Sequence, residues 1–195
     1  MTVQNKTTGV VFPTISAAIT GAGSGDTIDI SAGVYTEDPP KIDTDLTLQG
    51  IGGLAQLDDP SPSNGEAALV QDTANLTVAG MEIAGVAVSS GNGAAVRMET
   101  GGVLTIDNDW FHNNQDGLLT GAIAGATVDI SNSEFNDNGI EDGQTHNIYI
   151  GDIQQLNITD SYFHDALGGH EIKSRALNTD ITDTRIQDPA RLGRA

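Results

Sequence analysis

The sequence predicts an all-β solenoid: a single-stranded right-handed parallel β-helix with a short N-terminal capping helix. Three observations lead to this fold class. Short runs of alternating apolar residues recur at intervals of roughly 20–30 residues, which is typical of a repeat that forms one rung per turn of chain. The runs are rich in Ile, Val and Thr, as strands are. Finally, 24 glycines against only 4% aromatic residues indicate many bends and few large core side chains.

Composition excludes several classes of protein. The 195 residues suffice for one core, so we expect a single domain over 1–195. The formal charge of −19 disfavours nucleic acid and anionic membrane surfaces as partners. The absence of cysteine excludes disulfides, thiolate nucleophiles and cysteine-based metal sites. No apolar run reaches the roughly 18 residues of a membrane span, and the chain start shows no Sec-type signal peptide.

The N-terminal region, residues 8–24, is predicted to form a cap. Ile15, Ala18 and Ile19 follow helical spacing, with Thr14 or Ser16 available as the N-cap residue. A short amphipathic helix here would close the first rung and protect its strand edges.

Residues 25–188 are predicted to form six or seven rungs, because two strand registers share the repeat. In the first register, an apolar position recurs at Leu48, Val78, Ile106, Ile130, Ile158 and Ile181. The second register places apolar residues at Val96, Leu118, Ile148 and Ile172. After each copy of the first register a bend residue (Asn108, Asn132, Asp160, Asp183) precedes a large apolar one (Phe111, Phe135, Phe163, Ile186). Equivalent residues would stack at about 4.8 Å, which predicts an internal column of these large side chains.

The C-terminal residues 189–195 form a short tail with no obvious capping element. An open rung exposes apolar side chains and unpaired strand edges. We therefore expect a second copy of the chain to cover the last rung in an end-to-end dimer, and we expect the chain to be a truncated form of a longer parent.

Two sets of segments resemble known families. Residues 15–19, 25–28 and 32–35 resemble the opening of pectin-lyase-like β-helix proteins, and residues 145–150, 162–166 and 169–176 resemble a bacterial group of β-helix repeat proteins of poorly defined function. The likeness covers residues 8–188 and implies a carbohydrate-active or carbohydrate-binding module. The catalytic motifs of polygalacturonases, pectate lyases and alginate epimerases are not matched in order or composition, so no catalytic residue is transferred by motif.

Basic residues single out one candidate face. None occurs between Met98 and Glu171, and then Lys173 and Arg175 arrive at alternate strand positions that face the same way. Alignment of the rungs places Tyr149 one rung below Lys173, with Arg97 further along the same column. Such a set suits a lyase or epimerase acting on a uronate, with Arg175 holding the carboxylate, Lys173 as the base, and Tyr149 or His146 as the acid. The alternative is that both cations only pair with neighbouring acids.

The second-strand entrances supply the remaining candidates. Asp116, His146 and His170 fall at equivalent positions and predict a vertical column. Such a column can transfer protons or bind metal, or it can hydrogen-bond backbone groups freed at the corners. With Lys173, Arg175 and Tyr149, the two histidines complete the catalytic candidates. The substrate-binding candidates are Arg97, Asn147, Glu171 and Asp116.

No metal site is predicted, although Ca²⁺ is a possible cofactor. Asp107 with Asp109, and Glu141 with Asp142, offer oxygens at short spacing. The alternative is a solvated acidic surface, because no EF-hand loop or calcium-binding nonapeptide repeat is present.

Two functional hypotheses remain open. One is a secreted or cell-surface bacterial module that binds or processes an acidic polysaccharide. The other is a non-catalytic structural or adhesive module of a surface protein or phage fibre. They differ in whether the Tyr149, Lys173, Arg175 and His170 face is a walled cleft or flat, and the segment 53–67 could supply a wall.

Overall fold

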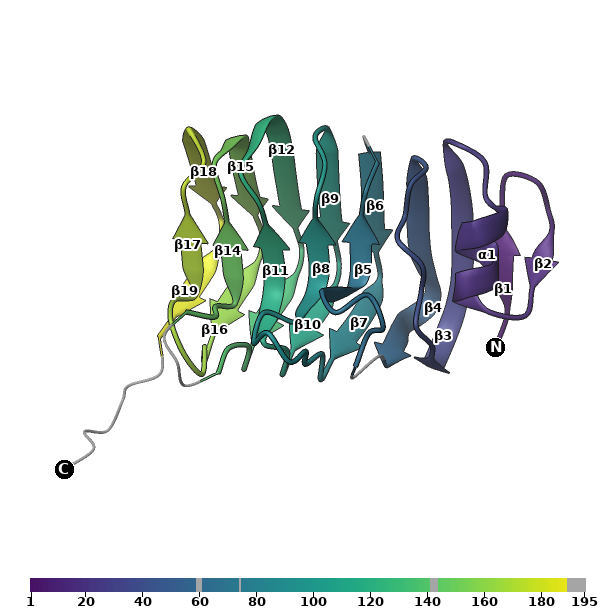
Figure 1. Cartoon of the computed structure of the whole chain (residues 1–195), viewed down its shortest axis with the longest axis horizontal. Helices are drawn as coiled ribbons and strands as arrows, with labels where there is room; N and C mark the ends of the chain where they lie inside the picture. Colours follow the sequence, from purple (N-terminus) through teal and green to yellow (C-terminus); the bar gives the residue numbers. More distant parts are fainter. Residues whose placement is uncertain (59–60, 74, 141–143, 189–195) are drawn as a thin grey trace.

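The protein is a parallel β-solenoid whose rungs follow one another along the long axis (Figure 1). The computed structural model describes residues 1–58, 61–73, 75–140 and 144–188. Its strands form a 14-stranded sheet and a five-stranded sheet. The tail at 189–195, and the calcium candidates Glu141 and Asp142, lie outside the described residues. Among the described residues, no helix has the length and apolar character to cross a membrane.

The strands of the solenoid occupy three sides of the coil. The five-stranded front sheet contains β5 (Ala67–Gln71), β8 (Ala94–Met98), β11 (Asp116–Thr120), β14 (Ile148–Ile150) and β17 (Ile172–Ser174). The first arm of the larger sheet contains β6 (Asn75–Ala79), β9 (Val103–Asp107), β12 (Ile123–Ser131), β15 (Ile153–Thr159) and β18 (Asn178–Thr182). Its second arm contains β7 (Met81–Ala84), β10 (Trp110–His112), β13 (Glu134–Asn136), β16 (Tyr162–His164) and β19 (Arg185–Gln187). The long strands β3 (Asp26–Thr36) and β4 (Leu46–Asp58) run through both arms and join them.

Both predicted strand registers are confirmed. Val78 pairs with Ile106, and the column continues through Ile130 and Ile158 to Ile181. Leu48 precedes Val78 in this column, and Ile28 precedes Leu48. On the front sheet, Val96, Leu118, Ile148 and Ile172 are successive register partners. Each inward residue therefore packs on its equivalent in the next rung, which gives one continuous apolar core along the axis.

The predicted column of large side chains is also present. Phe111, Phe135 and Phe163 are register partners and fully buried. Ile186 continues the column at the open end, where it is 50% exposed. Leu57 and Ile83 precede Phe111 in the same register, so the column is longer than the sequence pattern indicated.

The corners between the two arms are tight turns. Asn108, Asn132, Asp160 and Asp183 all have positive φ angles, from 47° to 58°. A second series, Asn113, Asp137 and Asp165, follows the second arm with φ angles of 53° to 57°. Asn and Asp tolerate this left-handed region because their short polar side chains bond locally. The predicted bend column is thus confirmed.

The N-terminal end carries a helix and a small hairpin. Helix α1 (Ile15–Gly21) buries Ile15, Ala18 and Ile19, and the Thr14 hydroxyl accepts a hydrogen bond from the Ala17 amide at 3.0 Å. Strands β1 (Val3–Asn5) and β2 (Val11–Phe12) form an antiparallel pair, and β1 also pairs with β3. The sequence pattern did not predict this hairpin, because its strands are too short to show a period.

Candidate functional site

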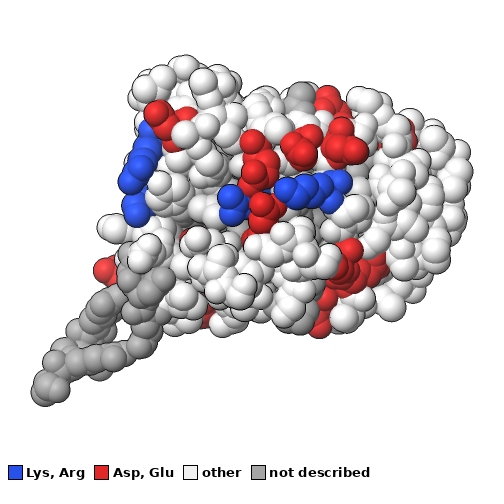
Figure 2. Space-filling view, in the orientation of Figure 1, with Lys and Arg blue, Asp and Glu red and all other residues white. Residues whose placement is uncertain are grey.

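The outward faces of β14 and β17 bring together a phenol and two cations. Tyr149 and Lys173 are register partners on these parallel strands. Lys173 Nζ lies 4.9 Å from the centroid of the Tyr149 ring, and Arg175 Cζ lies 5.6 Å from the same point. Both contacts are within the range of a cation–π interaction. The predicted lateral face therefore exists, and Figure 2 shows basic side chains exposed at the end of the molecule where β17 lies.

Among the described residues, no acidic side chain neutralises either cation of this face. In the part of the chain that the structure describes, no ion pair forms on Lys173 or Arg175. Other basic residues of the front side are paired: Lys41 contacts Glu66 at 2.8 Å, and Arg97 contacts Glu99. Arg97 is therefore held by an acid rather than free to join Tyr149. The alternative interpretation, that the basic residues only pair with neighbouring acids, therefore holds for Arg97 but not for Lys173 or Arg175.

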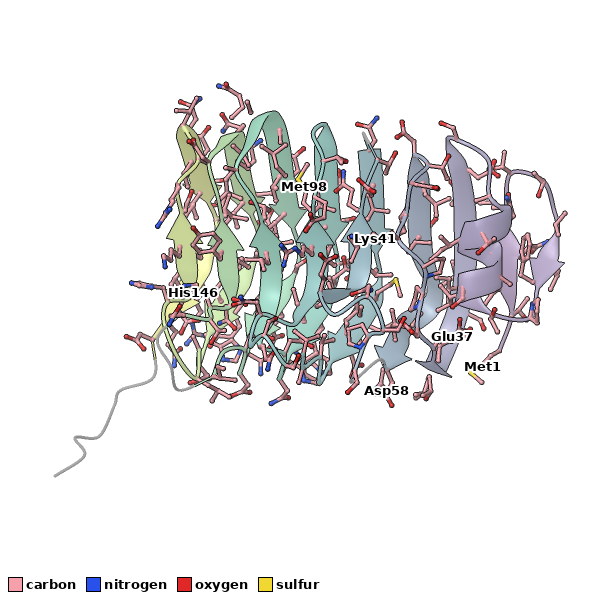
Figure 3. All side chains as sticks on the ribbon, viewed as in Figure 1. Met1, Glu37, Lys41, Asp58, Met98 and His146 are labelled. Atoms are coloured by element: carbon pink, nitrogen blue, oxygen red, sulfur yellow. The ribbon has the colours of Figure 1, made fainter. Side chains whose placement is uncertain are left out.

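A buried histidine lies beneath this face. His146 is fully buried and lies two residues before β14, at the lower end of the front strands (Figure 3). Its Nε2 is 3.2 Å from Lys173 Nζ, and its ring lies 5.8 Å from that of Tyr149. Its Nδ1 accepts a hydrogen bond from the His170 amide at 2.9 Å. Because Nδ1 is an acceptor, a neutral His146 ring carries its proton on Nε2, which faces Lys173.

The predicted column of Asp116, His146 and His170 is formed through backbone amides. Asp116 Oδ1 accepts from the His146 amide at 2.9 Å, one rung before His146 accepts from His170. The rings of His146 and His170 are 5.2 Å apart. Side chains at the strand entrances thus bond amide groups of the next rung, as the structural interpretation of the column required. Among the described residues, no group of three His, Asp or Glu side chains is arranged to hold a metal ion.

The structure places Asn147 and Glu171 inside the solenoid. Asn147 Oδ1 accepts from the Asn138 side chain at 2.8 Å, and Asn138 in turn accepts from Asn114. Asn147 Nδ2 donates to Glu171, whose second oxygen accepts from the Ala166 amide at 3.0 Å. Burial raises the pKa of Glu171. These two residues form an internal amide ladder, so they support the site from within and do not reach a ligand on the surface.

A glycine lets the next rung pass close to His146. Gly169 has a φ of 65°, and a Cβ atom there would lie 2.1 Å from His146 Nδ1. Any side chain at this position would displace the imidazole from Lys173. Gly169 is therefore a positioning residue that the sequence analysis did not identify.

The calcium candidates Asp107 and Asp109 accept hydrogen bonds from different parts of the chain. Asp107 Oδ1 accepts from the side chains of Ser131 and Asn132 at 2.7 and 2.8 Å. Asp109 turns inward and accepts from the Met81 amide at 2.6 Å. Burial raises the pKa of Asp109 well above its usual range. Each carboxylate is therefore engaged by donors of the chain itself, and Asp109 is buried.

A cavity that the sequence analysis missed lies at the corner between the two arms. Its volume is about 410 Å³, and its lining is Gly50, Gly53, Leu54, Asn108, Asp109, Trp110, Asn132 and Glu134. Gly53 and Leu54 thus wall this corner, whereas we had expected the segment 53–67 to wall the Lys173 face. One signal was available, because Trp110 is the chain's only tryptophan and occupies an outward position in the repeat.

The comparison with family models agrees with this architecture. The family model of the right-handed β-helix region matches residues 60–190. The chain belongs to this family. Among solved structures, it is similar to pectate lyase Pel9A, with 15% identity and a TM-score of 0.37, over 77% of this chain and 57% of that one. The chain thus spans little more than half the length of that enzyme. The comparison with curated proteins returned no match.

Proposed function

We propose that the face formed by Tyr149, Lys173 and Arg175 binds a uronate-containing polysaccharide and acts on it as a lyase or C5-epimerase. The observation that carries this proposal is a pair of cations over one phenol ring, neither of which forms an ion pair with a described residue. On a chain of net charge −19, such a pair is a local attraction for a carboxylate. The setting we propose is extracellular or at the cell surface of a bacterium.

The chemistry uses three side chains of this face. Arg175 binds the uronate carboxylate through its guanidinium and stabilises the negative charge that develops when C5 is deprotonated. Lys173 accepts the C5 proton. In a lyase, the C4–O4 bond then breaks, a C4=C5 double bond forms, and Tyr149 donates its proton to the departing O4. In an epimerase, Tyr149 instead donates its proton to C5 on the face opposite Lys173, and the tyrosinate then takes up a proton from solvent.

His146 orients the proposed base. His146 Nε2 lies 3.2 Å from Lys173 Nζ, so this buried ring fixes the position of the lysine side chain beside Tyr149. His170 contributes its amide to fix the tautomer of His146, and its exposed ring lies at the rim of the face.

One observation favours a second candidate function, a non-catalytic structural or adhesive module. The polar groups of Asp116, Asn147 and Glu171 bond the interior ladders, so the surface set is small. In that case, Lys173 and Arg175 would bind an anionic polymer without turnover.

The deciding experiment is a screen of alginate, pectate and glycosaminoglycans, with and without Ca²⁺. Ultraviolet absorbance reports the unsaturated lyase product, and NMR reports epimerisation. We expect turnover that the double variant Lys173→Ala/Arg175→Ala abolishes. Arg97→Ala is the matched control, because it removes a cation of the same sheet that is already paired with Glu99. Binding without turnover would support the second candidate. Equal polysaccharide affinity in the wild type and the double variant would overturn both.

A further inference from the structure

The corner cavity is created by an insertion in β4. Residues Gln49 and Ala55 of β4 pair with Ala79 and Met81, so the five residues 50–54 stand opposite the single residue Gly80. A Cβ atom at Gly50 would lie 1.9 Å from the Gly80 carbonyl oxygen, so the close crossing requires glycine. The insertion projects as a wall, and Gly80 adds no side chain to fill the space beside it.

The opposite wall is an indole held in a fixed position. His112 stacks on one face of Trp110, with ring centroids 3.9 Å apart and 26° between the planes. The Trp110 Nε1–H donates to Asn136 Oδ1 at 2.6 Å. With one ring face and the indole nitrogen occupied, Trp110 offers the cavity its remaining apolar surface.

The rest of the lining supplies hydrogen-bonding groups without a cation. Asn108 and Asn132 contribute exposed corner amides. Glu134 contributes a carboxylate whose side chain is 46% exposed and whose Oε1 contacts His164 Nε2 at 3.1 Å, which leaves Oε2 for a ligand. Asp109 is buried, and its Oδ2 has no hydrogen-bond partner among the described residues. Because burial raises the pKa of Asp109, the proton-bearing form of this carboxyl is favoured. The lining therefore suits hydroxyl groups and disfavours an anion.

We propose that this cavity is a saccharide subsite for a pyranose ring that carries no carboxylate. The apolar CH face of the ring would lie on Trp110, and its hydroxyls would bond Glu134 and the corner amides. A volume of about 410 Å³ is within the range of small-ligand sites. The subsite is separate from the Tyr149–Lys173–Arg175 face, because β9 and β10 belong to the large sheet behind the front strands (Figure 1). The chain would thus contact a neutral and an acidic sugar on two different sides.

Trp110 provides the readout, because it is the only tryptophan in the chain. The probes are methyl β-glucoside, methyl β-galactoside and N-acetylglucosamine, with galacturonate and tetramethylammonium as contrasts. We expect a saturable change in fluorescence with at least one neutral sugar and none with either contrast. Calorimetry with Trp110→Ala should then show affinity weakened about tenfold. Glu134→Gln keeps the shape of the lining and should weaken binding several-fold.

Tyr162→Ala is the matched control. Tyr162 occupies the same outward column two rungs further on and stacks on His164, but it does not line the cavity. Its monosaccharide affinity should equal that of the wild type. The proposal is overturned if no neutral probe binds, if galacturonate binds as tightly as the neutral sugars, or if tetramethylammonium alone binds. It is also overturned if Tyr162→Ala and Glu134→Gln weaken binding equally. None of these results depends on turnover at Lys173.

Discussion

Phe135 and Phe163 stack face to face across two rungs, with ring centroids 4.8 Å apart and planes only 7° from parallel. Phe111 meets Phe135 edge-on from the other side, at 5.2 Å and 86°. Phe135 is thus enclosed by aromatic rings above and below. Its ring therefore packs the rung of Phe111 and the rung of Phe163 onto the rung between them.

Replacing Phe135 with alanine should therefore lower the free energy of unfolding by roughly 3–5 kcal/mol, because a large cavity opens in a column that cannot collapse along its axis. Urea denaturation followed by circular dichroism measures this. Tyr162→Ala removes a ring of the neighbouring outward column and should cost much less. A loss below about 1 kcal/mol for Phe135→Ala would contradict the packing described.

The amide ladder makes a second prediction about stability. Asn138 Nδ2 donates to the Phe111 carbonyl and to Asn147, while Asn138 Oδ1 accepts from the Asn114 amide. Asn138→Leu leaves these buried groups unsatisfied, at about 1–3 kcal/mol each, so we expect the variant to lose several kcal/mol. Asn157→Ala is the control, since Asn157 bonds Asp129 on the outer face and should cost about 0.5 kcal/mol or less. Similar losses in the two variants would contradict the conclusion that the buried amide ladder contributes more to stability than the Asn157–Asp129 hydrogen bond on the outer face.

A third prediction concerns pH. Because burial raises the pKa of Asp109, the folded state holds a proton that the unfolded chain releases near the ordinary aspartate pKa. The free energy of unfolding therefore falls as the pH rises from the ordinary aspartate pKa of the unfolded chain to the higher pKa of Asp109 in the folded state. Asp109→Asn removes this loss and should raise the free energy of unfolding at pH 7 by roughly 1 kcal/mol or more.

Urea titrations of the wild type and Asp109→Asn at pH 4 and pH 7 test this prediction. Glu171 also has a pKa raised by burial, so the wild type and variant share that contribution and their difference isolates Asp109. If Asp109→Asn is less stable than the wild type at pH 7, the carboxyl is not a source of strain in the folded state.

The C-terminal edge leads to a prediction about assembly. Among the described strands, β17, β18 and β19 pair on one side only, and Ile181 and Ile186 are 39% and 50% exposed. We propose that a second copy covers this end. Light scattering at micromolar concentration should give a dimer, and the double variant Ile181→Asp/Ile186→Asp should give a monomer. A wild-type particle near 20.2 kDa would exclude the proposed dimer.

The rung registers could be predicted because stacked apolar positions repeat in the sequence, as Phe111, Phe135 and Phe163 do. The direction of the side chains at the strand entrances could not be predicted from the sequence. Alternation assigns inside and outside only along a regular strand, and Asn147 follows a corner where that alternation is interrupted. The adjacency of Lys173 and Tyr149 could be predicted, because it depends only on the register of their two strands. The burial of His146 under them depended on Gly169, whose close approach no periodic pattern reveals.

The corner cavity escaped prediction for a related reason. An insertion such as residues 50–54 interrupts the repeat, so in the sequence it is only a stretch between two strand halves that does not follow the apolar pattern. Only the structure shows that Gly50 crosses Gly80 and that the insertion faces Trp110.

The insertion in β4 leaves the pairing on both of its sides unchanged, since Gln49 still meets Ala79 and Ala55 still meets Met81. Loop length at a corner is therefore uncoupled from strand registration. A peptide grafted between positions 51 and 55 should be displayed on the side of the solenoid without disturbing the rungs, because Gly50 and Ile51 still pair with Ile30 and Ser31 of β3. The spacing between two such grafts could be chosen in steps of one rung, about 4.8 Å. Binding peptides could thus be attached along the solenoid at defined, regular distances from one another.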